Sequence, residues 1–231
     1  MCETIVLYDQ MDNPGANATV SQMFEPANAA FNNQGADDFV VPETDAWTVT
    51  QVVAGGVYFN GPGPSASFNV TFYSDTAGFP GAAVPGGTYT GLAYTNVPAG
   101  TFTITLSTPL LLAPGTYWVS VQANMNFTPF GEGGWNDRTV TSNSAAVWQN
   151  PAGGFGTSCT AYGRRGASCG IDPTAPDQIF QVMGCRTGLV NCGPLPVGMC
   201  HGICIHDPND YEHRLGTCKE HDAPVGCTCD L

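Results

Sequence analysis

Alternation of apolar and polar residues, repeated along most of the chain, is the feature that most limits how this protein can fold. It is clearest in SFNVTFYSD (residues 67–75) and TFTITLST (residues 101–108), and it recurs in GTYWVSVQ (residues 115–122). A period of two residues is that of a β-strand with one buried face. Because no segment of useful length has the 3.6-residue period of a helix, the sequence predicts an all-β fold.

Further short strands are expected between clusters of glycine and proline, at residues 39–41, 47–53, 56–59, 88–94, 144–148 and 178–183. Their outward positions are rich in Thr, Asn and Ser, as in a sheet with one solvent-facing side. Seven or more short strands at this spacing favour a β-sandwich of immunoglobulin-like or jelly-roll type.

The cysteines divide the chain unevenly, since nine of the ten lie at or after residue 159. This number of cysteines indicates disulfides and an oxidising compartment, hence a secreted or cell-surface protein. Residues 186–231 are too few to build a core alone, so we expect a small disulfide-rich appendage there. It would follow a sandwich at residues 37–185, and an N-terminal strand with a polar leader would occupy residues 1–36.

The net charge is strongly negative, at −13, and no Lys or Arg precedes Arg138. Nucleic-acid binding needs basic side chains, and anionic membranes repel such a surface, so neither partner is expected. No apolar run is long enough to span a membrane. There is also no basic segment followed by an apolar one, so we expect any secretion signal to have been removed.

Two stretches offer metal ligands, but neither has a known metal-binding spacing. The tail CHGICIHDPNDYEHRLGTCKEHDAPVGCTC combines Cys and His, yet it matches no zinc module. Calcium could use Asp37 and Asp38, or the acids of residues 207–212, but solvated turn acids are the favoured interpretation. No cofactor is therefore expected, and disulfides are expected at Cys192, Cys200, Cys204, Cys218, Cys227 and Cys229.

No catalytic pattern is found, so we do not expect an enzyme. The chain has no GxSxG elbow, no HExxH helix and no phosphate-binding glycine loop, and all four histidines lie in the tail. A glycosidase needs only two carboxylates, but scattered surface acids are the simpler interpretation of Asp37, Asp38, Asp45, Asp75, Glu132 and Asp137.

The sequence contains a candidate sugar-binding surface and candidate glycosylation sites. Phe127, Phe130 and Trp135 could form a sugar-stacking platform on a sandwich edge, although burial at the end of the core is favoured for aromatic rings. N-glycosylation sequons begin at Asn17, Asn69 and Asn126, and chance occurrence in a chain rich in Asn and Thr is the alternative.

An isolated apolar strand, ETIVLYD, lies near the N-terminus and is followed by the polar leader. Residues 3–9 could pair within their own chain, with residues 10–36 wrapping the sandwich, or they could add to the open edge of a neighbouring subunit. In the second case alternation would place Ile5 and Leu7 on one face and Val6 and Tyr8 on the other, and we expect all four side chains to be buried. The residues alone leave both alternatives open.

Four motifs give the chain a resemblance to known proteins: ADDFVVPETDAWTV, FYSDTAGFPG, LLAPGTYW and DQIFQVMG. Residues 3–185 resemble a class of bacterial secreted immunoglobulin-like sandwich modules, most of which have no assigned function. The chain also looks like the protomers of pilus-like extracellular fibrils that assemble by donor-strand exchange. This second resemblance implies a homopolymer in which residues 3–9 form the donated strand, with Ile5, Val6, Leu7 and Tyr8 as its assembly residues; a monomeric carbohydrate-binding module is the alternative.

Two disulfides can be predicted more specifically. Cys159 and Cys169 flank TAYGRRGAS and are expected to bond to each other, since a short loop containing glycine closes easily. Cys2 precedes the N-terminal strand and Cys185 follows the last strand of the sandwich. If those strands are neighbours, a Cys2–Cys185 bond would join them, between subunits in a fibril.

Overall fold

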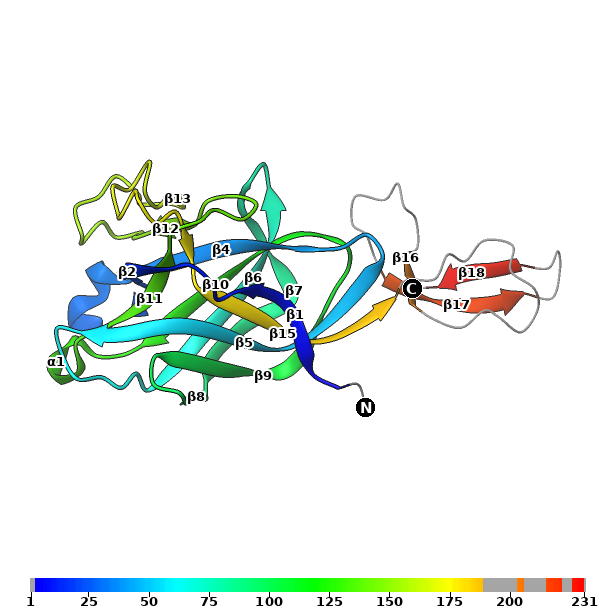
Figure 1. The fold of residues 1–231 in the computed structure, drawn as a ribbon, viewed down its shortest axis with the longest axis horizontal. Helices are drawn as coiled ribbons and strands as arrows, with labels where there is room; N and C mark the ends of the chain where they lie inside the picture. Colours follow the sequence, from blue (N-terminus) through cyan, green and yellow to red (C-terminus); the bar gives the residue numbers. More distant parts are fainter. Residues whose placement is uncertain (1–2, 189–202, 206–214, 222–225, 231) are drawn as a thin grey trace.

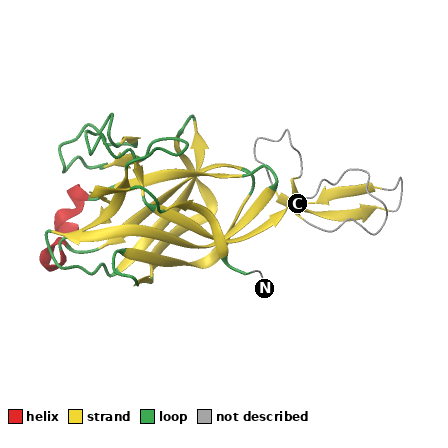
Figure 2. Cartoon of the chain, in the orientation of Figure 1, coloured by secondary structure: helices red, strands yellow, loops and turns green. Residues whose placement is uncertain are grey.

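The computed structural model describes residues 3–188, 203–205, 215–221 and 226–230. Residues 3–188 form two antiparallel sheets that pack face to face as a β-sandwich, so the predicted fold class is confirmed (Figures 1 and 2). Two short helical segments lie together at one end of the sandwich. They are η1 (Pro26–Phe31) and α1 (Phe127–Phe130). Among the described residues no helix is long and apolar enough to cross a membrane.

The first sheet is organised around the long strand β5 (Asp45–Phe59). On one side, β9 pairs with β5 and β8 pairs with β9. On the other side β15 pairs with the first part of β5, and β11 pairs with its last four residues. The other strands of this sheet are β1 (Ile5–Gln10), β2 (Pro14–Val20), β8 (Tyr94–Asn96), β9 (Thr101–Leu112), β11 (Glu132–Arg138), β14 (Asp177–Gln178) and β15 (Phe180–Gly188).

The second sheet has the order β13-β12-β4-β10-β6-β7, with the two-residue strand β3 added parallel to the end of β10. Its strands are β3 (Gln22–Met23), β4 (Gln34–Val41), β6 (Ser67–Thr76), β7 (Phe79–Leu92), β10 (Gly115–Asn124), β12 (Val147–Gln149) and β13 (Gly163–Arg164). The polar leader is thus ordered: it supplies β2 to one sheet and β3 to the other.

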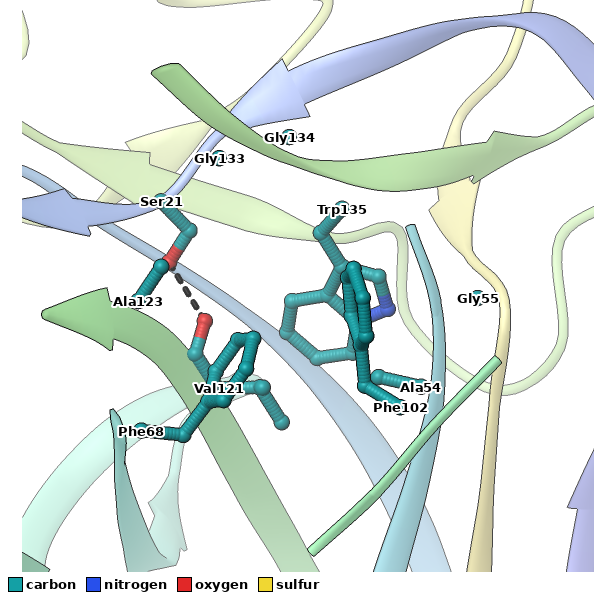
Figure 3. Close-up of a pocket in the computed structure, with 10 residues that line it drawn as sticks. All are labelled: Ser21, Ala54, Gly55, Phe68, Phe102, Val121, Ala123, Gly133, Gly134 and Trp135. Carbon is teal, nitrogen blue, oxygen red and sulfur yellow. Dashed lines mark hydrogen bonds between the residues drawn. The ribbon is translucent and has the colours of Figure 1, made fainter. Parts of the chain in front are cut away.

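The core between the sheets consists of the side chains that the alternation predicted to face inward. Phe68, Val70 and Phe72 of β6 are buried, and they pack with Phe102 and Ile104 of β9 in one continuous apolar cluster. Burying side chains of this size contributes about 1.5–3 kcal/mol each. The residual space is small, because a void beside Trp135 measures only about 10 Å³, room for roughly one water (Figure 3).

β5 is one continuous strand, whereas two strands at 47–53 and 56–59 were expected. Gly56 lies within the continuous strand and allows close packing, because a Cβ atom there would overlap the Phe102 ring and lie 2.8 Å from the Gly134 carbonyl oxygen. The strand therefore needs glycine at this position without turning there.

The segment after β11 covers the outer face of the second sheet. Trp118 points outward from β10, and is buried there against Ala36 and Val147. Cys159 and Cys169 form the predicted disulfide, which packs beside Trp148. This covering layer explains why β10 is buried on both faces although its sequence alternates.

Among the strands that the structure describes, the three beyond residue 202 pair only with one another. β16 (Ile203–Ile205), β17 (Leu215–His221) and β18 (Gly226–Asp230) form a separate antiparallel sheet. This pairing agrees with a distinct C-terminal unit.

Candidate assembly site

The N-terminal strand β1, which was predicted as an assembly element, lies at the edge of the first sheet. It pairs antiparallel with β15 of its own chain, with Ile5 opposite Gly184 and Gln10 opposite Phe180. Among the described strands, only β15 pairs with β1. β1 therefore presents one unpaired edge, which is the type of edge to which another strand can add.

A β-bulge changes which side chains of β1 face the core. Val6 is opposite Met183 and Tyr8 is opposite Val182, so Leu7 is an extra residue in the pairing. As a result Leu7 and Tyr8 both pack against the core, whereas Ile5 and Val6 are 38% and 45% exposed. Within its own chain β1 therefore lacks the alternation expected of the donated strand, because a bulge places two consecutive side chains outside the period of two. Burial of all four side chains in a neighbouring subunit stays a prediction.

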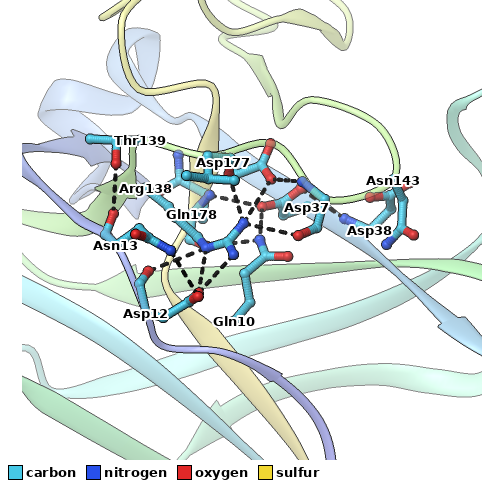
Figure 4. Close-up of polar contacts among 12 residues, drawn as sticks. Gln10, Asp12, Asn13, Asp37, Asp38, Arg138, Thr139, Asn143, Asp177 and Gln178 are labelled. Carbon is cyan, nitrogen blue, oxygen red and sulfur yellow. Dashed lines mark hydrogen bonds and ion pairs between the residues drawn. The ribbon is translucent and has the colours of Figure 1, made fainter.

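Tyr8 and Gln10 anchor the end of β1. The Tyr8 ring lies 5.4 Å from the Phe180 ring and 6.0 Å from the Phe39 ring, centroid to centroid, and its hydroxyl donates to Gln10 Oε1 at 2.7 Å. Gln10 is fully buried, and its Nε2 donates to Asp37 Oδ2 at 2.8 Å and to the Gln178 carbonyl at 3.0 Å (Figure 4). These bonds join β1 to the second sheet through β4.

β1 and β2 follow one another along the same sheet edge, because β15 and β11 occupy successive parts of β5. Residues 11–13 form a kink between them, with Asn13 at a φ of 51°. Asp12 accepts hydrogen bonds from Arg138 at 2.7 and 2.9 Å, and the Asn13 carbonyl accepts one from Thr139 N at 3.0 Å. A rotation at this kink would move β1 and leave β2 in place.

Three buried carboxyls lie beneath the anchored end of β1: Asp37 and Asp38 of β4, and Asp177 of β14. Asp37 accepts from Gln178 N at 2.8 Å, and Asp38 accepts from Ser144 N. Of the three, only Asp177 has an ion pair within the described residues, with Arg138 at 3.5 Å. The interpretation of Asp37 and Asp38 as solvated turn acids is therefore wrong, because covering loops and the facing sheet enclose β4 on both sides.

Burial shifts the pKa values of this cluster upward. It raises the pKa of Asp38 to about 6, and likewise that of Asp177 to about 6, against the hydrogen bonds from Ser144 and Ser142. The pKa of Asp37 rises well above its usual value, through burial and then through the charge of Asp177. Burial, followed by the charges of Asp37 and Asp38, raises the pKa of Tyr8 to about 12.

A second buried pair lies beneath β2. Arg165 Nη1 is 2.5 Å from Asp137 Oδ1 and donates to Thr19 Oγ1 at 2.6 Å, and both charged side chains are almost completely buried. The interpretation of Asp137 and Glu132 as surface acids is wrong, since both are buried. The sequence did contain a signal for one of these sites, because the Asp37–Asp38 pair directly precedes the predicted apolar strand at residues 39–41.

The predicted cysteines are only partly within the described residues. Cys185 is disulfide-bonded, while Cys2 lies outside the described residues, so the Cys2–Cys185 bond stays a prediction. The strands next to the two cysteines, β1 and β15, are neighbours, which is the condition set for that bond. Cys192 and Cys200 also lie outside, and the side-chain pairing of the cysteines in β16–β18 stays a prediction.

The proposed aromatic platform is not assembled in this form. Trp135 is buried in the core and donates from Nε1 to the Ile179 carbonyl at 2.7 Å, whereas Phe127 is exposed. Burial of Trp135 was the favoured alternative and is confirmed. Of the sequon residues, Asn17 and Asn126 are exposed, and Asn69 is half-buried with its Nδ2 donating to Asn124 Oδ1 at 2.9 Å.

Within residues 3–188 and the three C-terminal strands, no group of three His, Cys, Asp or Glu side chains could hold a metal ion. The acids of residues 207–212 lie largely outside the described residues. Comparison with protein-family models and with curated proteins finds no match for this chain.

Proposed function

We propose that this protein is a structural subunit of an extracellular pilus-like fibril, which polymerises by donating β1 to a neighbouring subunit. One observation carries the proposal: β1 is an edge strand, and no β1 residue belongs to the buried apolar core, against which Leu7 and Tyr8 only pack. The core can thus persist in a subunit whose own β1 has left. The vacated edge of β15 would then accept the same strand from another copy.

Exchange of identical strands changes few contacts. A donated β1 would remake its pairing with β15, its two apolar contacts and the Gln10–Asp37 bond, now between chains. The free-energy difference therefore rests on the kink at residues 11–13 and on the entropy lost on association. Because the donor and acceptor surfaces are different patches, the contact is head-to-tail and can continue indefinitely.

An extracellular site of action is supported by the Cys159–Cys169 disulfide and the bonded state of Cys185. If Cys2 of the donated strand bonds to Cys185 of the acceptor, that link between chains would also make a fibre resistant to dissociation.

The test uses an introduced disulfide at the β1–β15 pair. Val6→Cys and Met183→Cys place two thiols directly opposite each other. In a fibre these thiols belong to different chains, so non-reducing electrophoresis should give a ladder of multimers, and electron microscopy should show filaments. The matched control, Gln51→Cys with Thr105→Cys, joins β5 to β9 within one chain and should add no ladder of its own.

Two outcomes would contradict the proposal: a single monomer band, meaning that β1 stays in its own sheet, or a dimer band alone, meaning a closed exchange. A complementary experiment deletes residues 1–10 and adds a synthetic peptide of residues 3–13. The truncated protein should keep its sandwich, remain monomeric and bind the peptide. A peptide with Leu7→Asp and Tyr8→Asp should not bind, since it lacks both core contacts.

A further inference from the structure

A pocket at one end of the sandwich, with no residue of β1 in its lining, is walled by four phenylalanines. Its volume is about 370 Å³, which lies in the range of small-molecule sites. Phe24 and Phe31 come from the segment that includes η1, Phe127 begins α1, and Phe155 comes from the covering loop. The two short helical segments that bring these rings together are adjacent in Figure 2.

The rings are held in place but remain open to the pocket. Phe31 meets Phe155 edge to face at 5.3 Å and Phe24 at 6.3 Å, while Phe31, Phe127 and Phe155 are each 36–39% exposed. Glu25 fixes the opposite wall, because its carboxylate accepts from Phe127 N at 2.8 Å and from Asn28 Nδ2 at 2.6 Å. Apolar rings gathered around one cavity indicate a binding site.

The polar part of the lining consists of Asn28, Asn60 and Glu132, and Glu132 gives it a negative charge. Glu132 is only 9% exposed and accepts a hydrogen bond from Asn60 Nδ2. Ion pairs among the described residues involve Arg138 and Arg165, not Glu132, and no described residue that lines the pocket is basic. A nearly buried carboxylate without a counter-charge is costly unless a cation joins it.

We propose that this pocket binds an organic cation, an ammonium group with alkyl substituents such as a quaternary ammonium. The negative faces of the aromatic rings attract such a group, which also has apolar surface to bury against them. Glu132 supplies the counter-charge, and the net charge of −13 raises the local concentration of cations. An anionic ligand is excluded by the same charges.

The test compares choline with its neutral analogue of the same shape, 3,3-dimethyl-1-butanol, by calorimetric or NMR titration of the full chain. Choline should bind about tenfold more tightly or better, because only the cation interacts with the rings and with Glu132. The same titration is made with a short peptide that contains trimethyllysine. Tighter binding of this peptide than of choline would identify a modified protein side chain as the ligand, and tighter binding of choline would identify a small molecule.

Glu132→Gln keeps the acceptor for Asn60 and removes the charge, so it should weaken choline binding about tenfold and leave the neutral analogue unaffected. The matched control, Glu43→Gln, removes an exposed charge that does not line the pocket and should change neither. Phe127→Leu is a second variant, at an exposed position, and should also weaken choline binding.

Equal binding of choline and its neutral analogue would overturn the proposal, as would no binding at millimolar concentrations. Binding of a neutral hexose in place of choline would assign a sugar site instead. The pocket contains no residue of β1 or of its anchor, so these outcomes are independent of whether the protein forms fibres.

Discussion

β1 and β2 occupy successive positions along one sheet edge, yet they are held in different ways. β2 is fixed by a buried ion pair, since Thr19 contacts both Arg165 and Asp137. β1 is held by two half-buried apolar side chains and by one amide, Gln10, which is bonded to a carboxyl. In the proposed assembly, β2 is the permanent half of this edge and β1 is its exchangeable half, and the kink at residues 11–13 divides them.

The largest expected effect concerns the permanent half. Arg165→Met should lower the free energy of unfolding by about 3–5 kcal/mol, because it leaves Asp137 buried without its partner. Urea denaturation at neutral pH measures the change. Arg186→Met, at an exposed position, is the control and should stay within about 0.5 kcal/mol of wild type.

The double variant Arg165→Met with Asp137→Leu sharpens this result. It removes both charges and should recover most of the lost stability. If Arg165→Met alone costs less than about 1 kcal/mol, the ion pair does not fix β2 and the contrast between the two halves fails.

A smaller effect is expected in the exchangeable half. Leu7→Ala should cost about 1 kcal/mol, whereas Leu112→Ala, the same substitution in the core, should cost about 2–5 kcal/mol. Hydrogen exchange should likewise protect the amides of β1 less than those of β5. Equal costs for the two substitutions would mean that β1 is an integral part of the core.

An effect of similar size is expected from pH, through the acids beneath β1. Asp38 and Asp177 have pKa values of about 6 in the folded protein and about 3.9 when unfolded, so between these values only the folded state binds the protons. Stability should therefore rise as pH falls from about 7 to about 4, by about 1 kcal/mol or more after screening by water.

Urea midpoints between pH 4.5 and pH 7.5 check this dependence. Asp38→Asn should reduce the dependence without abolishing it, because an amide cannot take up a proton whereas Asp177 still can. Below pH 4 the trend should reverse, since Glu25 and Asp172 have pKa values lowered by hydrogen bonds and lose those stabilising bonds on protonation. A stability that falls steadily from pH 7 to pH 4.5 would contradict the upward shifts of both pKa values.

Features that depend on residues close together in the sequence were predicted correctly, whereas features that depend on contacts between distant residues were not. Alternation predicted the buried faces of β6 and β9, because period-two patterns are local and their consequence in a sandwich is direct. The Cys159–Cys169 bond was predictable for the same reason, since it closes a short loop. The bulge at Leu7 was not, because it depends on where β15 lies relative to β1.

Burial of charge was the main feature that prediction missed. Asp37, Asp137 and Arg165 belong to different elements, and each is acceptable in the interior only because the others or nearby amides satisfy it. Read singly, each resembles a surface residue. Prediction missed the phenylalanine pocket for the same reason, because its four rings come from three separate segments of the chain.

By itself, the sequence determined an all-β sandwich with apolar side chains at alternate positions and a chemistry suited to an oxidising compartment, because these properties follow from local periodicity and composition. Only the tertiary structure decided which strand forms the sheet edge, which acids lose contact with water, and which aromatic rings share a pocket. Those features depend on contacts between residues far apart in the chain, such as Gln10 and Gln178, which are separated by 168 positions, and no local pattern encodes such contacts.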